Sequence, residues 1–132
     1  MKSTLVPGIQ GEHKHRVVSE NLVSHFNPHG PAVLGSPFLL LLMESAAWRA
    51  MAPHLEQGED SVGVGFDFRH LAPTPPGMIV VAKAEVREVS GHMVTLSIEA
   101  HDEHEKIGEG THVRAVIDLE RFKKRHRKKV EG

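Results

Sequence analysis

The sequence predicts an α+β fold in which a strongly curved antiparallel sheet of five strands wraps around one long central helix. The apolar run Phe38–Met43 leaves no polar face in the first turns of a helix, so that helix should be covered on nearly every side. Beyond residue 60 the chain alternates apolar and polar residues, as strands do, with short turns between the segments. The 132 residues contain no repeat and no internal linker, so we expect one domain over residues 1–120 and a tail at 121–132.

The central helix is expected to begin at Ser36 and to end at Pro53. Ser36 is expected to cap the N-terminus, because a serine hydroxyl accepts from the free amides of the first turn, and Pro37 suits the first helical position. Glu44 lies in the middle, and its neighbours three and four positions away are all apolar: Leu40, Leu41, Ala47 and Trp48. A carboxylate in such surroundings is expensive to bury, and groups of this kind are typical of functional sites.

The strands are expected over the ranges 12–18, 61–69, 78–89, 93–101 and 107–119. The second strand should place its large apolar side chains on one face: Val62, Val64, Phe66 and Phe68. Gly63 and Gly65 fall on the other face, which indicates that something packs or binds closely there. In the last strand one alternating set is in step: Thr111, Val113, Ala115, Ile117 and Leu119.

Composition and charge indicate a soluble, cytoplasmic protein with an uneven charge distribution. There is no cysteine, which excludes disulfides and thiolate metal sites and fits a reducing compartment, and no apolar segment resembles a signal peptide or membrane span. Residues 121–132 hold seven Lys or Arg and one acid, whereas the other 120 residues hold nine basic and sixteen acidic side chains. We expect this basic tail to be a solvated, frayed terminus, with binding of an anionic cofactor or of nucleic acid as the alternative.

Three polar residues, Ser36, Glu44 and His70, form a set suited to hydrolysing an acyl bond. A hydroxyl at a helix N-terminus, an isolated carboxylate and an imidazole at a strand end supply the required groups. Ser36 and Glu44 are eight residues apart, so they lie about 12 Å apart along one helix and cannot touch within one chain. We therefore hypothesise that a two-fold dimer brings Ser36 of one subunit near Glu44 of the other.

Each of these residues also has a simpler interpretation. Ser36 is expected in any case as a helix cap, and His70 is one of eleven histidines. Glu44 could form a structural ion pair with one of three arginines: Arg49, Arg69 or Arg114. The remaining histidines form no tight cluster of three or more ligands, so no metal is expected.

The run GSPFLLLLMESAAWRAMAPHLEQGEDSVGVGFDFRHLAPTPPG resembles the fluoroacetyl-CoA thioesterase branch of the hotdog-fold thioesterases. The resemblance continues through AEVREVSGHMVTLSIEAHDEHEKIGEGTHVRAVIDLERF, and so extends from about Val33 to Phe122. It implies the hotdog fold, dimers or larger assemblies with active sites at the subunit interface, and hydrolysis of an acyl-CoA to CoA and a free acid without cofactor or metal.

The resemblance also assigns roles to residues. The family's catalytic threonine, glutamate and histidine fall on Ser36, Glu44 and His70, and its glycine near the thioester falls on Gly63, followed by Val64. Arg114 and the basic tail are candidates for contact with the substrate's CoA portion.

Two departures from the family pattern bear on the substrate. Ser36 keeps the hydroxyl of threonine but loses its methyl group, and residues 27–32 lack the phenylalanines that gate the fluoroacetyl enzyme's pocket. We therefore expect a short- or medium-chain acyl-CoA as substrate. The alternatives are a hotdog hydratase or dehydratase and a protein that binds acyl-CoA without catalysis. Nucleic-acid binding is disfavoured, because the tail contains only one aromatic residue, Phe122.

Overall fold

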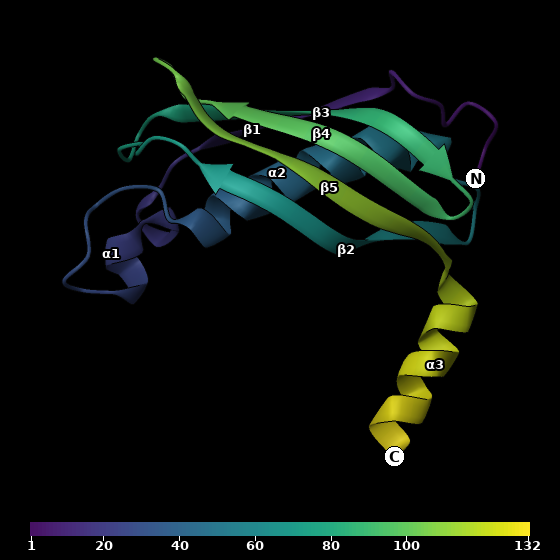
Figure 1. Cartoon of the computed structure of the whole chain (residues 1–132). Coiled ribbons are helices and arrows are strands. Elements are labelled where there is room, and N and C mark those ends of the chain that lie inside the picture. The colour runs from purple at the N-terminus through teal and green to yellow at the C-terminus, as the bar shows by residue number, and fades with distance from the viewer.

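Five antiparallel strands form one sheet that curls around a single long helix, as the sequence predicts (Figure 1). The computed structural model describes all 132 residues. The elements follow in this order: β1 (Gln10–Arg16), η1 (Ser19–Asn21), α1 (Val23–Phe26), α2 (Ser36–Met51), η2 (Ala52–His54), β2 (Glu59–His70), β3 (Ile79–Ser90), β4 (Met93–His101), β5 (Lys106–Asp118) and α3 (Leu119–Glu131). In space the strands lie in the order β1-β3-β4-β5-β2, so β1 and β2 form the two edges. No helix is both long and apolar enough to cross a membrane.

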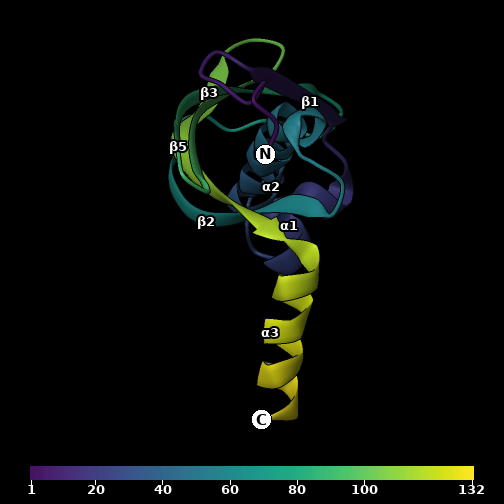
Figure 2. The same ribbon diagram turned by 90° about the vertical axis from the view of Figure 1, so that its right-hand side faces the viewer.

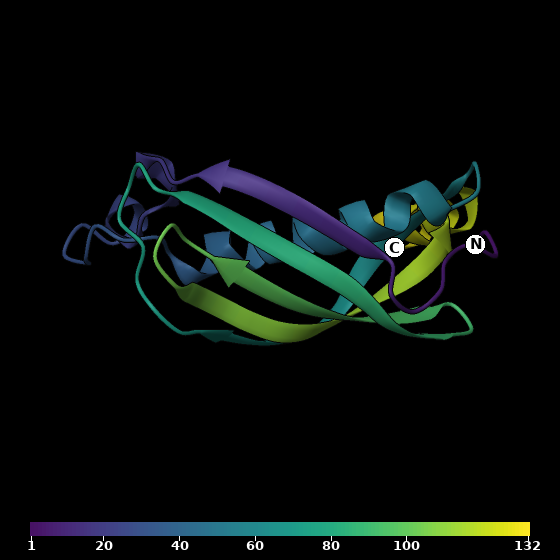
Figure 3. The same cartoon turned by 90° about the horizontal axis from the view of Figure 1, so that it is seen from above.

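The core lies between α2 and the concave face of the sheet, which curves around the helix in Figure 2 and crosses it obliquely in Figure 3. One side of α2 is buried along its whole length. The buried residues of the helix are Leu39, Leu42, Met43, Ala46, Ala47, Ala50 and Met51. Strands β3 and β4 meet it with the expected alternation, and their buried residues include Val80, Ala82, Ala84, Val86, Val94, Leu96, Ile98 and Ala100. Burial of this apolar surface stabilises the fold by roughly 25 cal/mol per Å².

The expectation that α2 is buried all round is wrong for the single chain. Leu41 is 55% exposed and Trp48 is 44% exposed, because the two edges of the sheet do not meet over this side of the helix. The start of the helix also differs from the expectation. Gly35 occupies the N-cap position, Ser36 is the first helical residue, and no side chain caps the first turn.

The first strand begins two residues earlier than predicted and includes Gly11 instead of starting after it. This glycine faces α2 so closely that a Cβ there would overlap the backbone of Ala46 and Ala50. A glycine inside a strand commonly marks such a close approach. Strand β1 therefore packs directly on the helix backbone at Ala46 and Ala50.

Strand β2 does not alternate regularly, because a bulge interrupts its pairing with β5 between Gly63 and Gly65. The extra residue reverses the side-chain alternation, as β-bulges do. The prediction that Val62 and Val64 share a face with the two phenylalanines is therefore wrong, and so is the prediction that both glycines share the other face. Phe66 and Phe68 pack against the core, whereas Val64 is 52% exposed.

Strand β5 places its apolar set on the outer side of the sheet. Val113, Ala115 and Ile117 are in step as predicted, but it is the residues between them that are buried: His112, Arg114 and Val116. The inner face of β5 therefore brings two polar side chains beneath the helix.

The basic tail is helical, which corrects the expectation of a frayed terminus. Asp118 caps α3 by accepting a hydrogen bond from the backbone N–H of Arg121 at 3.0 Å. The helix runs away from the body on the side of the β2 edge, and every residue from Arg121 onward is exposed (Figures 1 and 2).

We expect Gly11→Ala to lower the free energy of unfolding, because the added methyl group would force β1 and α2 apart. Overpacking of this kind costs about 1–3 kcal/mol. Denaturant unfolding measures the change, and Gly65→Ala is the matched control, since a Cβ at Gly65 meets nothing within 4 Å. Equal losses in the two variants would contradict the close approach.

Candidate active site

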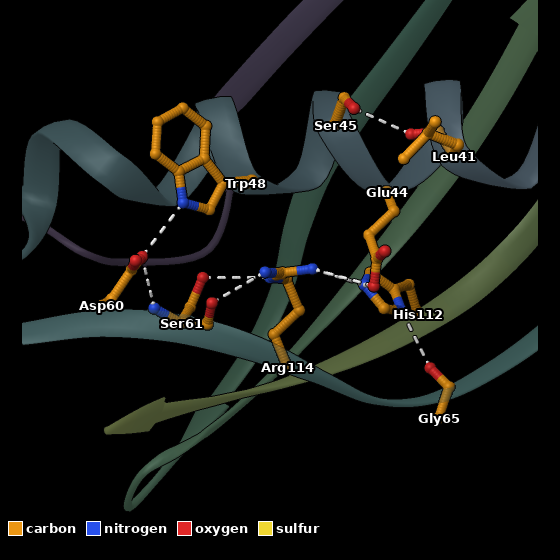
Figure 4. A network of polar contacts seen from close by, with 9 residues as sticks. All are labelled: Leu41, Glu44, Ser45, Trp48, Asp60, Ser61, Gly65, His112 and Arg114. Atoms are coloured by element: carbon orange, nitrogen blue, oxygen red, sulfur yellow. Dashed lines mark hydrogen bonds and ion pairs between the residues drawn. The ribbon is translucent and has the colours of Figure 1, made fainter. Parts of the chain in front are cut away.

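Glu44 is partnered by an arginine from the sheet. Its carboxylate Oε2 lies 3.2 Å from Nη1 of Arg114, on the inner face of β5 (Figure 4). Glu44 has only apolar neighbours on its own helix, and its charge partner comes instead from a strand distant in sequence. The Glu44 side chain remains 41% exposed, so this carboxylate is both held by a cation and open to solvent on one side.

Arg114 is held by several hydrogen bonds and in turn positions the other residues of the site. Its Nε donates to the Ser61 hydroxyl at 3.0 Å, its Nη2 donates to the Ser61 carbonyl at 2.8 Å, and its Nη1 lies 3.1 Å from Nε2 of His112. Only 4% of the residue is exposed. Burial lowers the pKa of Arg114, while the nearby carboxylates of Glu44 and Asp60 raise it, and an arginine remains charged in either case.

His112 was not identified from the sequence, although it lies in the centre of this cluster. Its Nδ1 is 2.8 Å from the carbonyl of Gly65, and because a carbonyl only accepts, this nitrogen carries the proton. The other nitrogen, Nε2, then accepts from Arg114. Burial lowers the pKa of His112, the hydrogen bond to Gly65 raises it, and the charge of Arg114 lowers it further. The ring stacks on Phe66 with 4.4 Å between centroids, so it is a rigid, neutral support for the arginine.

The signal for His112 was its position in step with Arg114 on β5. The alternation of that strand places both on one face, opposite the apolar set. Choosing the inner face by hydrophobicity alone selects the wrong set, because the polar residues here are buried through hydrogen bonds to one another.

Gly63 lies directly against the Glu44 carboxylate. A Cβ at this position would overlap Glu44 Oε2 and would lie 3.1 Å from the His112 ring. The residue stands next to the β2 bulge, opposite Arg114 in the strand pairing. The absence of a side chain leaves room for the carboxylate, and Val64 beside it points outward.

Ser36 and His70 form a second polar pair within the same chain. The Ser36 hydroxyl is 2.8 Å from Nδ1 of His70, so this serine contacts the histidine instead of capping the helix. Nε2 of His70 is buried without a hydrogen-bond partner. Burial lowers the pKa of His70, and the nearby backbone of Ala72 raises it by a smaller amount. A hydroxyl and a neutral imidazole at the start of α2 are thus positioned together.

The two polar groups are separated by two turns of α2, so the three residues predicted from the sequence do not meet in one chain. A hollow of about 480 Å³ opens beside Glu44 and Arg114, on the uncovered side of the helix. Its lining includes Glu44, Trp48, Gly63 and Arg114 but neither Ser36 nor His70. The arrangement offers an arginine-paired carboxylate at an open surface and a hydroxyl–imidazole pair at the helix N-terminus.

Comparison with known proteins gives this arrangement its context. A family model described as a fluoroacetyl-CoA-specific thioesterase matches residues 17–120. The chain belongs to this thioesterase family. The fluoroacetyl-CoA thioesterase of Streptantibioticus cattleyicolor is 41% identical over 136 residues, and the match covers 98% of each protein. The resemblance found in the sequence is confirmed.

Solved structures confirm the hotdog fold of this thioesterase family member. The fluoroacetyl-CoA thioesterase FlK superposes with a TM-score of 0.90 at 40% identity, over 96% of this chain and 98% of that one. A hot-dog-like protein from Thermanaerovibrio acidaminovorans superposes with a TM-score of 0.88 at 25% identity, over 96% of this chain and 93% of that one. The curved sheet and central helix are therefore the shared scaffold of this family and of a more distant relative.

No group of three or more His, Asp or Glu side chains in this thioesterase family member is placed to hold a metal ion. His15 is hydrogen-bonded to the Asn21 side chain at 2.7 Å. Burial and then the charge of Arg49 lower the pKa of His13. The site has a single carboxylate, that of Glu44, whose charge is balanced by Arg114. A carboxylate of this kind is suited to accepting and releasing a proton.

The buried His112 should make the fold sensitive to acid. A histidine has a pKa of about 6.5 in the unfolded chain, and the folded value is lower, so the unfolded state binds the proton more readily. Stability is therefore complete above about pH 6.5 and falls as the pH drops below it. His112→Asn retains a donor for Gly65 but has no titrating group, so its free energy of unfolding should fall less between about pH 7 and pH 5. The comparison isolates His112, since His70 and His13 remain in both proteins, and parallel curves would contradict the assignment.

Proposed function

We propose that this protein is an acyl-CoA thioesterase that hydrolyses a short- or medium-chain acyl-CoA to the free acid and CoA. The observation that carries the proposal is the carboxylate of Glu44, held by Arg114 against the bare backbone of Gly63 at an open hollow. Membership of a thioesterase family, whose named relatives act on a CoA thioester, supplies the chemistry that such a group would serve. A reducing cytoplasm, where acyl-CoA is available, suits a chain without cysteine.

Glu44 would act as general base. Arg114 lies on Oε2, which leaves Oε1 to accept a proton from a water molecule. The water oxygen then bonds to the thioester carbonyl carbon, the carbonyl oxygen takes the negative charge, and the C–S bond breaks as the carbonyl re-forms. General-base catalysis of this kind contributes about 10²–10⁴-fold to a rate. The CoA thiolate leaves and receives the proton that Glu44 took from the water, which restores the Glu44 carboxylate.

Backbone amides would hold the developing negative charge. At the start of α2, Pro37 has no N–H and the N–H of Phe38 already donates to the Gly35 carbonyl at 3.0 Å, so the N–H of Ser36 is the amide available there. The N–H groups of Gly63 and Val64, at the bulge beside Glu44, are the other donors near the site. Ser36 and His70 would orient the thioester or pass a proton to the leaving thiolate, because His70 is neutral at pH 7 and its Nδ1 is already bonded to the serine.

A second subunit would complete the site. Strand β2 is an edge strand with an exposed Val64, and an open edge is a template for pairing with another chain. The uncovered side of α2 exposes Leu41 and Trp48, large apolar side chains that a partner would bury. Pairing two β2 edges about a two-fold axis would place the Ser36–His70 pair of one subunit across the interface from Glu44 of the other.

Glu44→Ala should abolish nearly all thiol release, by about 10²-fold or more, since it removes the proton acceptor. The measurement is release of free CoA from a panel of acetyl-, propionyl-, butyryl- and hexanoyl-CoA, with circular dichroism to show that the variant folds. Glu103→Gln is the matched control, because Glu103 is an exposed acid in the β4–β5 turn. Wild-type turnover in Glu44→Ala would refute the role of this carboxylate, and substrate binding without thiol release by the wild type would refute the thioesterase.

Mixed dimers test whether the site is shared between subunits. Glu44→Ala and the double variant Ser36→Ala/His70→Ala should each be nearly inactive alone. When they are co-expressed, half of the dimers carry one chain of each kind, and each such dimer retains one of its two composite sites. Activity should then return to roughly a quarter of wild type for a two-fold symmetric dimer. If every site lies within one chain, co-expression restores nothing.

A further inference from the structure

The C-terminal helix α3 is a basic rod with no partner in the chain. Its thirteen residues, Leu119–Glu131, carry all seven Lys and Arg residues of the tail, and none of them forms an ion pair. Several basic residues of the sheet are, by contrast, paired with glutamates: Lys14, Lys83, Arg87 and Lys106. Four basic residues of the body also lack an ion pair, namely Lys2, Arg16, Arg49 and Arg69, but the largest group of unpaired basic side chains, seven in all, lies on this one projecting element.

Such a helix is not stable by virtue of its own sequence. Isolated helices shorter than about 12–15 residues are marginal in water, and like charges four residues apart destabilise them further. Those repulsions occur at Arg121 with Arg125 and at Lys124 with Lys128. The cap at Asp118 and the acid Glu120 in the first turn favour the helix at one end only. An anion bound along the rod would relieve the repulsion that the chain itself leaves uncompensated.

The remainder of the protein has the wrong charge for an anionic substrate. Residues 1–120 hold sixteen acidic and nine basic side chains, so the body repels the phosphates that CoA carries. The rod stands at the end of β5, the strand that also supplies Arg114. Four residues of extended strand, about 13 Å, separate Arg114 from Asp118, where the rod begins.

We propose that α3 binds the phosphate groups of the CoA nucleotide while the acyl end of the substrate reaches Glu44. The inference rests on the proposed function, because it identifies which part of the chain holds the leaving group of that reaction. A nucleic acid is the competing polyanion. The rod offers one aromatic side chain, Phe122, for base stacking, whereas the family of this chain is defined by a CoA thioester, so the observations favour the nucleotide of CoA.

The test separates phosphate binding from turnover. Lys123, Lys124, Lys128 and Lys129 are replaced together by Gln, whose helix propensity is close to that of Lys, so α3 is retained. Calorimetry then measures the affinity of wild type and variant for CoA and for pantetheine, which lacks the nucleotide. We expect the variant to bind CoA roughly tenfold more weakly, from four exposed charge contacts, and to bind pantetheine as the wild type does. The difference should shrink as salt is added, because exposed charges are screened beyond about 8 Å at physiological ionic strength.

The matched control replaces the same number of basic side chains on the outer face of the sheet by Gln: Lys14, Lys83, Arg87 and Lys106. This control should leave CoA affinity unchanged. Equal CoA affinity in the α3 variant and the wild type would overturn the inference. So would tight binding of labelled single-stranded RNA or duplex DNA that the α3 variant loses while its CoA affinity is kept. Because binding of CoA needs no hydrolysis, failure of the thioesterase itself would be recognised separately, as absence of thiol release by the wild type.

Discussion

The buried guanidinium of Arg114 is the interaction on which the candidate site depends. It joins the edge strand β2 through Ser61, its own strand through His112 and the central helix through Glu44. A bidentate, planar cation can make these contacts at once, whereas a lysine could not. Truncating it would leave the buried acceptors on Ser61 and His112 without donors, at about 1–3 kcal/mol each. The same residue thus connects two strands to the helix and fixes the position of the Glu44 carboxylate.

The β2 bulge has a complementary role. It turns the strand so that Gly63 faces Glu44 and the Gly65 carbonyl faces His112, while both phenylalanines still reach the core. A regular strand would offer either the glycine to the carboxylate or the aromatic residues to the core, because its alternation is fixed. The irregularity in the ladder is what lets one strand serve both the packing and the site.

Sequence reasoning predicted the architecture because the architecture depends on the spacing of apolar residues along each segment, which is a local property. The apolar helix, the order of the elements along the chain and the candidate residues Glu44, His70 and Gly63 follow from such patterns or from the family resemblance, whereas the pairing of β2 with β5 instead of β3 was not predicted. It misjudged β2 and β5 for a common reason: the bulge changes which residues share a face, and His112 and Arg114 are buried through contacts with residues far away in the sequence. It also assigned Ser36 to a cap, since the His70 side chain that it contacts is 34 positions away. The α3 helix was missed because charge composition indicates solvation but does not exclude helical structure.

The Ser36–His70 pair is separated from Glu44 because of the way the sheet wraps around α2. Five strands cover most of α2, and only the side between β1 and β2 remains accessible to a substrate. A carboxylate on that side must stand where the helix is uncovered, but the helix N-terminus with Ser36 and His70 lies two turns away, beyond reach of the same carbonyl. A chain of this size has no further element to bridge that gap, since α3 points outward from the β2 edge. In the proposed dimer, an identical neighbour at that edge would supply the Ser36–His70 pair and would cover the exposed Leu41 and Trp48 with the same surface. In the proposed enzyme, the shared active site and the burial of the open helix face are therefore two consequences of one interface.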